Sequence, residues 1–234
     1  MRDVVVFDLD GTLTRKDTYL GFLAAVLRER PWRAFGCLHL PICFALFRAG
    51  LVSNSWLKAS FLKAVAGGLT RDDLAKTAEL FAGTVVSGYL RRGARERLAR
   101  HREAGARIVI ATASLDVYVP QIAARLGVSS ADMICTRTHW TGKDTLSGAL
   151  DGDNCYGEAK VEAVRGWLAA NGLTGVAAAY SDHHSDLPLL AMADKPVAVN
   201  PTPGLRRLAQ DHGIPVEDWS GNAAVEETAP DGVV

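Results

Sequence analysis

The decisive stretch of this sequence is VVVFDLDGT, at residues 4–12. Four apolar residues followed by a polar, glycine-containing loop are typical of a buried parallel strand that carries Asp8 and Asp10 to its carboxyl end. If the backbone stays extended, the two carboxylates point to opposite faces, whereas a curl at Gly11 lets both face one ligand. A simple turn would explain the Asp pair alone. The strand before the pair and Thr12 after it favour catalysis, with Asp8 as nucleophile and Asp10 handling a proton.

Apolar strands and helices alternate along most of the chain. Strands are predicted at residues 107–112, 133–137, 176–180 and 196–199, with helices between them. This alternation indicates an α/β fold with a mostly parallel sheet and helices on both faces. Residues 19–89 show a helical pattern instead, without a clear strand.

The long helical stretch predicts a small all-helical cap, residues 17–89, inserted after the first strand. The core then consists of residues 1–16 and 90–220. Residues 221–234 are small and acidic and contain Pro and Gly. We expect them to form a flexible tail.

Two further segments carry groups suited to phosphate. Thr112 ends the second predicted strand, and Ala113 and Ser114 follow it. A hydroxyl and backbone N–H groups at such a place can bind phosphate oxygens, although Ser and Thr there are also ordinary turn formers. Lys160 lies in the first turn of a predicted helix, where a cation opposes the helix dipole unless an anion accompanies it. A surface lysine is the alternative.

The fourth segment of interest is YSDHHSDLP, at residues 180–188. Asp182 follows an apolar strand, and Asp186 lies near the start of the next helix, where a carboxylate is favoured. Two more carboxylates near Asp8 would repel one another unless a divalent cation joined them, and Mg²⁺ prefers oxygen ligands of this kind. The adjacent His183 and His184 would suit zinc only with further ligands at the usual spacing, so we interpret them as loop residues.

Composition excludes several classes of protein. Lys plus Arg equals Asp plus Glu at 26 each, so no basic excess points to nucleic acid as a partner. The four cysteines form no C-x-x-C pair and have no accompanying histidine cluster, which is typical of reduced cysteines in a cytoplasmic protein. The predicted strand begins at Val4 with no charged and apolar leader pattern before it, so we expect no secretory signal.

The most apolar stretch is Ala34–Phe47, 14 residues that include His39 and Pro41. A helix that spans a bilayer needs about 20 apolar residues, so this stretch is too short. We interpret it as the helical core of the cap. The alternative is a segment that touches a membrane surface, which would make the protein membrane-peripheral.

Together these segments resemble the haloacid dehalogenase superfamily, and their order and spacing look like its subfamily IB, the phosphoserine-phosphatase-like group. The resemblance covers about residues 4–201 and implies a Rossmann-like sheet with a helical cap. It also implies a phosphatase that hydrolyses a phosphomonoester through an aspartyl-phosphate on Asp8. Asp10 would protonate the leaving oxygen and then activate water.

The resemblance also implies the binding roles in the site. Mg²⁺ would be held by Asp8, by the backbone carbonyl of Asp10 and by Asp182, with Asp186 close by. The phosphoryl oxygens would be held by four residues: Gly11, Thr112, Ala113 and Lys160, of which Lys160 also counts as catalytic.

Departures from that group bear on the substrate. Phosphoserine phosphatases tend to have Glu nine residues after the nucleophile, where this chain has Asp17, which we interpret as a substrate gate. Ala113 replaces the Gly that usually follows the strand-end hydroxyl residue. These departures make phosphoserine a weaker candidate, so we expect a small phosphorylated metabolite whose identity the sequence does not give. The alternatives are a phospholipid head group, as in phosphatidylglycerophosphatases, a phosphate-binding module without turnover, and phosphotransfer to an acceptor other than water.

Overall fold

The computed structural model describes residues 3–220, so the tail predicted at 221–234 lies outside the described residues. The strands are β1 (Val4–Phe7), β2 (Arg107–Leu115), β3 (Met133–Thr136), β4 (Thr138–Trp140), β5 (Leu146–Leu150), β6 (Val176–Ser181), β7 (Ala193–Val199) and β8 (Val216–Glu217). The helices are α1 (Thr18–Glu29), η1 (Pro31–Cys37), α2 (Leu40–Arg48), α3 (Asn54–Ala66), α4 (Arg71–Thr84), η2 (Val85–Tyr89), α5 (Arg92–Glu103), α6 (Val119–Arg125), η3 (Ser130–Asp132), α7 (Glu158–Ala170), η4 (His184–Asp186), α8 (Leu187–Ala191) and α9 (Pro203–His212).

Six strands form one parallel sheet in the order β3-β2-β1-β6-β7-β8. β1 lies inside it, with Val5 opposite Ile108 of β2 and Ala178 of β6. The predicted α/β class and parallel sheet are therefore confirmed. Because neighbouring parallel strands end at the same edge, the residues that follow β1, β2 and β6 meet there.

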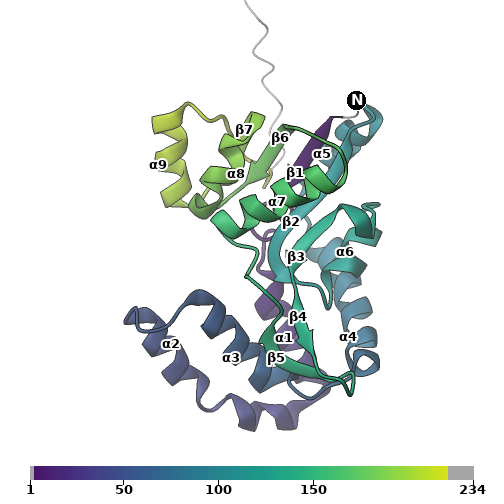
Figure 1. Ribbon diagram of the computed structural model, residues 1–234, viewed down its shortest axis with the longest axis vertical. Helices are drawn as coiled ribbons and strands as arrows, with labels where there is room; N and C mark the ends of the chain where they lie inside the picture. Colours follow the sequence, from purple (N-terminus) through teal and green to yellow (C-terminus); the bar gives the residue numbers. More distant parts are fainter. Residues whose placement is uncertain (1–2, 221–234) are drawn as a thin grey trace, which may run out of the picture.

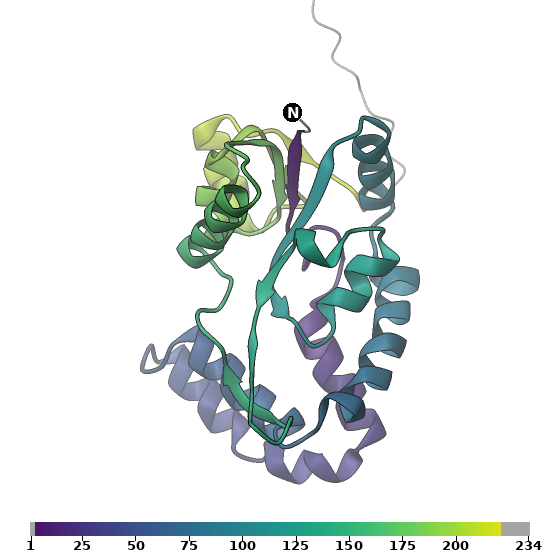
Figure 2. The same cartoon turned by 45° about the vertical axis from the view of Figure 1, so that its right-hand side comes forward.

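The side chains of β1 alternate between two cores. Val5 and Phe7 pack in the cluster that includes residues of α5 and α6, and Val4 and Val6 pack in the cluster that includes residues of α7, α8 and α9. Figure 2 shows these two groups of helices on opposite sides of the sheet. A strand buried on both faces is apolar at every position, which explains the unbroken apolar run that opens the sequence.

Helices α1 to α4 lie beyond the edge of the sheet at which β1 ends, in the lower half of Figure 1. A two-stranded hairpin, β4 with β5, is separate from the main sheet and packs against these helices. Its Leu146 donates to the carbonyl of Leu69 at 2.8 Å and accepts from Gly68 at 2.7 Å, and its side chain is buried. The residues between β3 and α7 therefore hold the helical stretch from a second side. They fall within residues 90–220, the range that the sequence predicts as core.

The structure corrects two expectations about the chain's apolar segments. The strand predicted at 196–199 begins earlier, at Ala193, and is followed by β8, so it is not the last strand. The stretch Ala34–Phe47 is not a buried core, because only Leu40 and Cys43 are buried in it. α2 is too short to turn more than one narrow face toward α3, and η1 has no buried residue. Within residues 3–220, no helix has the length and apolar character to cross a membrane.

The hairpin approaches α3 closely at Gly148. A Cβ atom there would lie 2.5 Å from the Cα of Lys63, and the residue has φ +85°. Gly152 shares that φ value but has open space around it. We expect Gly148→Ala to lower the free energy of unfolding by about 1–3 kcal/mol more than Gly152→Ala. Both variants place alanine in a strained backbone conformation, but only the new methyl group at position 148 would clash with α3. Chemical denaturation of both variants measures the difference, and equal losses would contradict the close packing.

Candidate active site

A cavity of about 300 Å³ lies at the carboxyl ends of β1, β2 and β6, and we call it the acidic cavity. It is lined by Asp8, Asp10, Asp17, Asn54, Thr112, Ala113, Tyr156, Lys160, Asp182, His183, Ser185 and Asp186. These include every side chain that the sequence suggested for the site. Gly11 adjoins it, because a Cβ atom on Gly11 would lie 2.2 Å from Oδ2 of Asp182. The chain therefore approaches Asp182 so closely that only glycine fits.

Asp8, Lys160 and Asp186 form a buried chain of ion pairs. Nζ of Lys160 donates to Oδ1 of Asp8 at 2.8 Å and to Oδ2 of Asp186 at 2.6 Å. Ser181 also donates to Oδ2 of Asp186, at 2.7 Å. Lys160 is thus not the surface lysine of the alternative interpretation. A cation in the first turn of a helix needs anionic partners. Here they are Asp8, directly after β1, and Asp186, at the end of η4.

Burial and like charge act together on these groups. Burial raises the pKa of Asp8 to about 8; the ammonium of Lys160 opposes the rise, and Asp186 and Asp182 add to it. Burial also raises the pKa of Asp182, to about 6. Burial disfavours the ammonium of Lys160, but Asp8 and Asp186 outweigh it and raise its pKa. Five aspartates and one lysine line the cavity, so carboxylates outnumber cations in its lining.

Thr12 connects the two carboxylates that face the cavity from β1 and β6. Its hydroxyl lies 3.2 Å from Oδ2 of Asp8 and 3.2 Å from Oδ1 of Asp182. The second oxygen of Asp182 faces Gly11, as described above. The chain thus curls after Asp8, with φ +84° at Gly11, a conformation in which glycine is favoured.

Asp10 is held in a fixed orientation at the same cavity. Its Oδ1 accepts from the backbone N–H of Thr18 at 2.6 Å, and its Oδ2 accepts from the hydroxyl of Ser114 at 2.6 Å. Tyr118, which is fully buried, donates to Ser114 at 2.8 Å. Both carboxylates of the opening motif therefore face one cavity, which is the curled arrangement that the catalytic interpretation of the motif predicts.

Thr112 and Asp17 have structural partners as well as cavity positions. The hydroxyl of Thr112 accepts from the backbone N–H of Ser114 at 3.0 Å and lies 3.5 Å from Oδ2 of Asp10. Asp17 caps α1, because its Oδ1 accepts from Leu20 N–H at 2.7 Å. A carboxylate at a helix N-cap stabilises the helix whatever else it does. Asp17 therefore positions the start of α1 at the cavity rim.

Sequence reasoning missed several groups around the cavity. Nζ of Lys58, from α3, donates to the carbonyl of Ala113 at 2.7 Å and to Oδ1 of Asn154 at 2.7 Å. Burial lowers the pKa of Lys58 to about 8, while Asp10 and Asp17 oppose the change. Arg91 donates to the carbonyl of Gly11 at 3.1 Å. No motif marks these residues, since each comes from a segment distant in sequence from its partners.

The donor set suits a hard divalent cation. Among residues 3–220, no three side chains of His, Cys, Asp or Glu are grouped closely enough to hold a metal by themselves. Two carboxylates, Asp8 and Asp182, with a backbone carbonyl and waters would be sufficient for Mg²⁺. Oδ1 of Asp186 is buried without a hydrogen-bond partner in this part of the chain, so it has an acceptor position for a metal-bound water.

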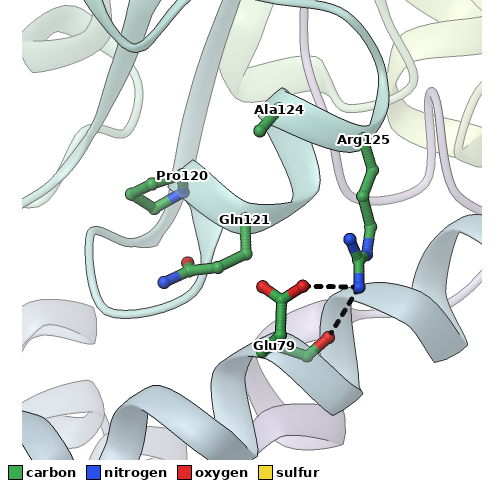
Figure 3. A pocket seen from close by; sticks show the side chains of 5 residues that line it. All are labelled: Glu79, Pro120, Gln121, Ala124 and Arg125. Atoms are coloured by element: carbon green, nitrogen blue, oxygen red, sulfur yellow. Dashed lines mark hydrogen bonds and ion pairs between the residues drawn. The ribbon is translucent and has the colours of Figure 1, made fainter.

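A different cavity, of about 420 Å³, lies between α4 and α6 (Figure 3). It is lined by Glu79, Pro120, Gln121, Ala124 and Arg125, and an ion pair of 2.7 Å joins Arg125 to Glu79 across it. It shares no residue with the acidic cavity. An exposed ion pair of this kind contributes little to stability, and no nucleophile accompanies it. The acidic cavity is therefore the candidate active site.

Known proteins resemble this chain over most of its length. Protein CicA from Caulobacter vibrioides is 33% identical over 195 residues, which cover 82% of this chain and 83% of CicA. Phosphoserine phosphatase SerB1 from Mycobacterium tuberculosis is 29% identical over 220 residues, 91% of this chain and 70% of SerB1. The crystal structure of a protein with unknown function from Bordetella pertussis Tohama I has a TM-score of 0.81 and 29% identity, over 94% of this chain and 99% of that one.

The family model for haloacid dehalogenase-like hydrolases matches residues 5–191. The matched range begins in β1 and ends in α8, so it includes every residue that lines the acidic cavity. The chain belongs to the haloacid dehalogenase-like hydrolase family.

Proposed function

We propose that this protein is a magnesium-dependent phosphatase in which Asp8 attacks a phosphomonoester. One observation carries the proposal: the buried carboxylate of Asp8 is held at the acidic cavity between Nζ of Lys160 and the hydroxyl of Thr12. A nucleophile fixed in this way needs little reorganisation before attack. Family membership and the phosphatase names of relatives such as SerB1 support the same reaction.

In the first step, an oxygen of Asp8 forms a bond to phosphorus, and the bond from phosphorus to the leaving oxygen breaks. Asp10 gives its proton to that oxygen, so the product leaves as an alcohol. Ser114 and the N–H of Thr18 keep Asp10 oriented for this transfer. The ammonium of Lys160 would compensate charge on the phosphoryl oxygens, and the N–H groups of Gly11 and Ala113, with Thr112, would bind them.

In the second step, Asp10 takes a proton from water, and the water oxygen bonds to phosphorus of the aspartyl-phosphate. The bond from phosphorus to Asp8 breaks, so inorganic phosphate leaves and the carboxylate is regenerated. Bound Mg²⁺ would neutralise charge on the phosphoryl group. Asp8, the carbonyl of Asp10 and Asp182 would hold it, with Asp186 accepting from a coordinated water.

We infer that residues 17–89 act as a cap that selects the substrate, with 1–16 and 90–220 as the catalytic core. Asn54 and Asp17 of this stretch line the acidic cavity, and Lys58 contacts Ala113 near the carboxyl end of β2. The β4–β5 hairpin supports the same stretch from the other side. Substrate choice would then depend on residues that do not take part in phosphoryl transfer.

The cavity size favours a small phosphorylated metabolite. Asp17 at the rim would interact with a cationic or hydroxyl group of the substrate, and Lys58 supplies positive charge nearby. A phospholipid head group is the second candidate, because the apolar stretch of the cap is exposed rather than buried. The four cysteines are free, which fits work in the cytoplasm.

The nucleophile is tested with Asp8→Asn on a soluble aryl phosphate in the presence of Mg²⁺. We expect kcat to fall at least about a thousandfold, because an amide does not form the aspartyl-phosphate. Asp17→Asn is the matched control and should retain turnover of this generic substrate. Thermal melting shows whether each variant folds. Full activity of folded Asp8→Asn would refute the assignment.

Metal binding is tested by stability rather than turnover. The folded protein raises the pKa of Asp8 to about 8 and that of Asp182 to about 6, so it keeps protons that the unfolded chain releases above about pH 4. The stability that these protons provide is lost as pH rises toward 8. We therefore expect the metal-free protein to melt at a lower temperature at pH 8 than at pH 5, and Mg²⁺ to raise Tm more at pH 8.

The matched variant for this prediction is Asp182→Asn, which removes one of the repelling carboxylates. It should weaken both the dependence of Tm on pH and the effect of Mg²⁺. If Mg²⁺ raises Tm equally in the variant and the natural protein, Asp182 is not a ligand. A substrate panel of phosphorylated metabolites and lipid phosphates, with and without Mg²⁺, then separates the two substrate candidates.

A further inference from the structure

Large apolar side chains are exposed on η1, α2 and the turn that follows. We call six of them the apolar patch: Trp32, Phe35, Leu38, Ile42, Phe44 and Leu51. Phe35 is 79% exposed and Leu38 is 78% exposed. Single exposed apolar residues are ordinary, but several large ones within one short segment mark a surface that binds something apolar.

The local structure explains why these side chains face outward. Leu40 and Cys43 lie one turn apart and form the buried side of α2, which contacts α3. Ile42 and Phe44 therefore fall on the other sides of the helix. α2 lies at the lower left of Figure 1, at the opposite end of the molecule from α9. Within residues 3–220 no element covers the patch.

The segment that carries the patch is rich in cations. Residues 30–71 contain six Lys or Arg and no Asp or Glu, although the whole chain has no net charge. Arg48 ends α2 and is exposed, and Arg28 is exposed in the last turn of α1. Arg33 instead donates to the backbone carbonyls of Val65 and Gly67 and so fixes η1 against the end of α3. Arg30 and Arg71 are paired with carboxylates, at 3.0 Å from Glu29 and at 2.7 Å from Asp144. Arg48 and Lys63 are exposed cations of the segment that take part in no ion pair within residues 3–220.

We propose that the apolar patch docks on the surface of an anionic lipid bilayer. Aromatic and aliphatic side chains would enter the boundary between head groups and acyl chains, and the neighbouring arginines would contact lipid phosphates. A second copy of this chain fits less well, because two basic surfaces would face each other. The absence of acidic residues over 42 positions suits an anionic surface, since no carboxylate would be forced against it.

Docking would place the acidic cavity close to the bilayer. Leu51 of the patch lies three residues before Asn54, which lines that cavity. Three residues span at most about 10 Å of chain, so the membrane contact and the cavity share one end of α3. The docking surface is inferred from exposure and charge alone and does not depend on the proposed reaction.

The test uses the full chain and sedimentation with vesicles of phosphatidylcholine, alone or mixed with phosphatidylglycerol. We expect the protein to sediment with the mixed vesicles, to bind the neutral ones more weakly, and to detach as salt increases. Leu38→Ser should lower partitioning to the mixed vesicles about tenfold, because the variant no longer transfers a leucine side chain from water into the bilayer. Arg48→Gln should reduce the preference for phosphatidylglycerol.

Leu80→Ser is the matched control, because Leu80 is also largely exposed but lies on α4, outside the patch. It should sediment like the natural protein. Melting temperature and turnover of a soluble aryl phosphate should be unchanged in all three variants, which separates loss of docking from loss of fold. If the proposed reaction is wrong, the melting temperature still shows whether each variant is folded.

Three outcomes would overturn the proposal. One is no sedimentation with either type of vesicle. Another is an equal loss in Leu38→Ser and Leu80→Ser. The third is a concentration-dependent dimer in solution that Leu38→Ser converts to monomer, which would show that a second copy covers the patch.

Discussion

The site depends on one buried cation placed between two carboxylates. Lys160 contacts Asp8 at 2.8 Å and Asp186 at 2.6 Å, and all three groups are almost inaccessible to solvent. Buried charges are costly unless they are paired and hydrogen-bonded, so this arrangement constrains the fold around it. The fold must bring together the end of β1, the segment after β6 and the first turn of α7. The parallel sheet, with β1 between β2 and β6, provides that meeting point.

Much of this arrangement could be predicted from the sequence. The apolar run of residues 4–7 indicates a strand buried on both faces, and the position of Asp8 at its end follows from that. Asp182 and Asp186 were found for the same reason, since an apolar strand precedes them. Lys160 had a weaker signal because a lysine near a helix start is usually a surface residue. Only the accompanying carboxylates made it a site residue, and its burial in the structure agrees with that interpretation.

Other contacts at the site could not be predicted from motifs or from periodicity in the sequence. Lys58 contacts Ala113 and Asn154, and each of the three comes from a different part of the chain. Pairing between such distant segments is decided by tertiary packing, which periodicity does not describe. For the apolar stretch Ala34–Phe47, the sequence provides a signal, but the prediction from it is wrong. Its composition suggests a core, but a short helix can bury only one face, and η1 buries none.

The groups proposed for the chemistry and those proposed for substrate selection lie on different parts of the fold. The groups proposed for phosphoryl transfer follow strands of a sheet packed on both faces, where small displacements are resisted. The rim is built from α1 and α3, and α3 is held by the hairpin through Leu146 and Gly148. A change in the hairpin or in α3 would therefore move Asn54, Lys58 and the apolar patch together. Asp8 follows β1 and Lys160 lies in α7, outside the hairpin and α3. Changes in the hairpin or in α3 would therefore leave the ion pair between Asp8 and Lys160 in place.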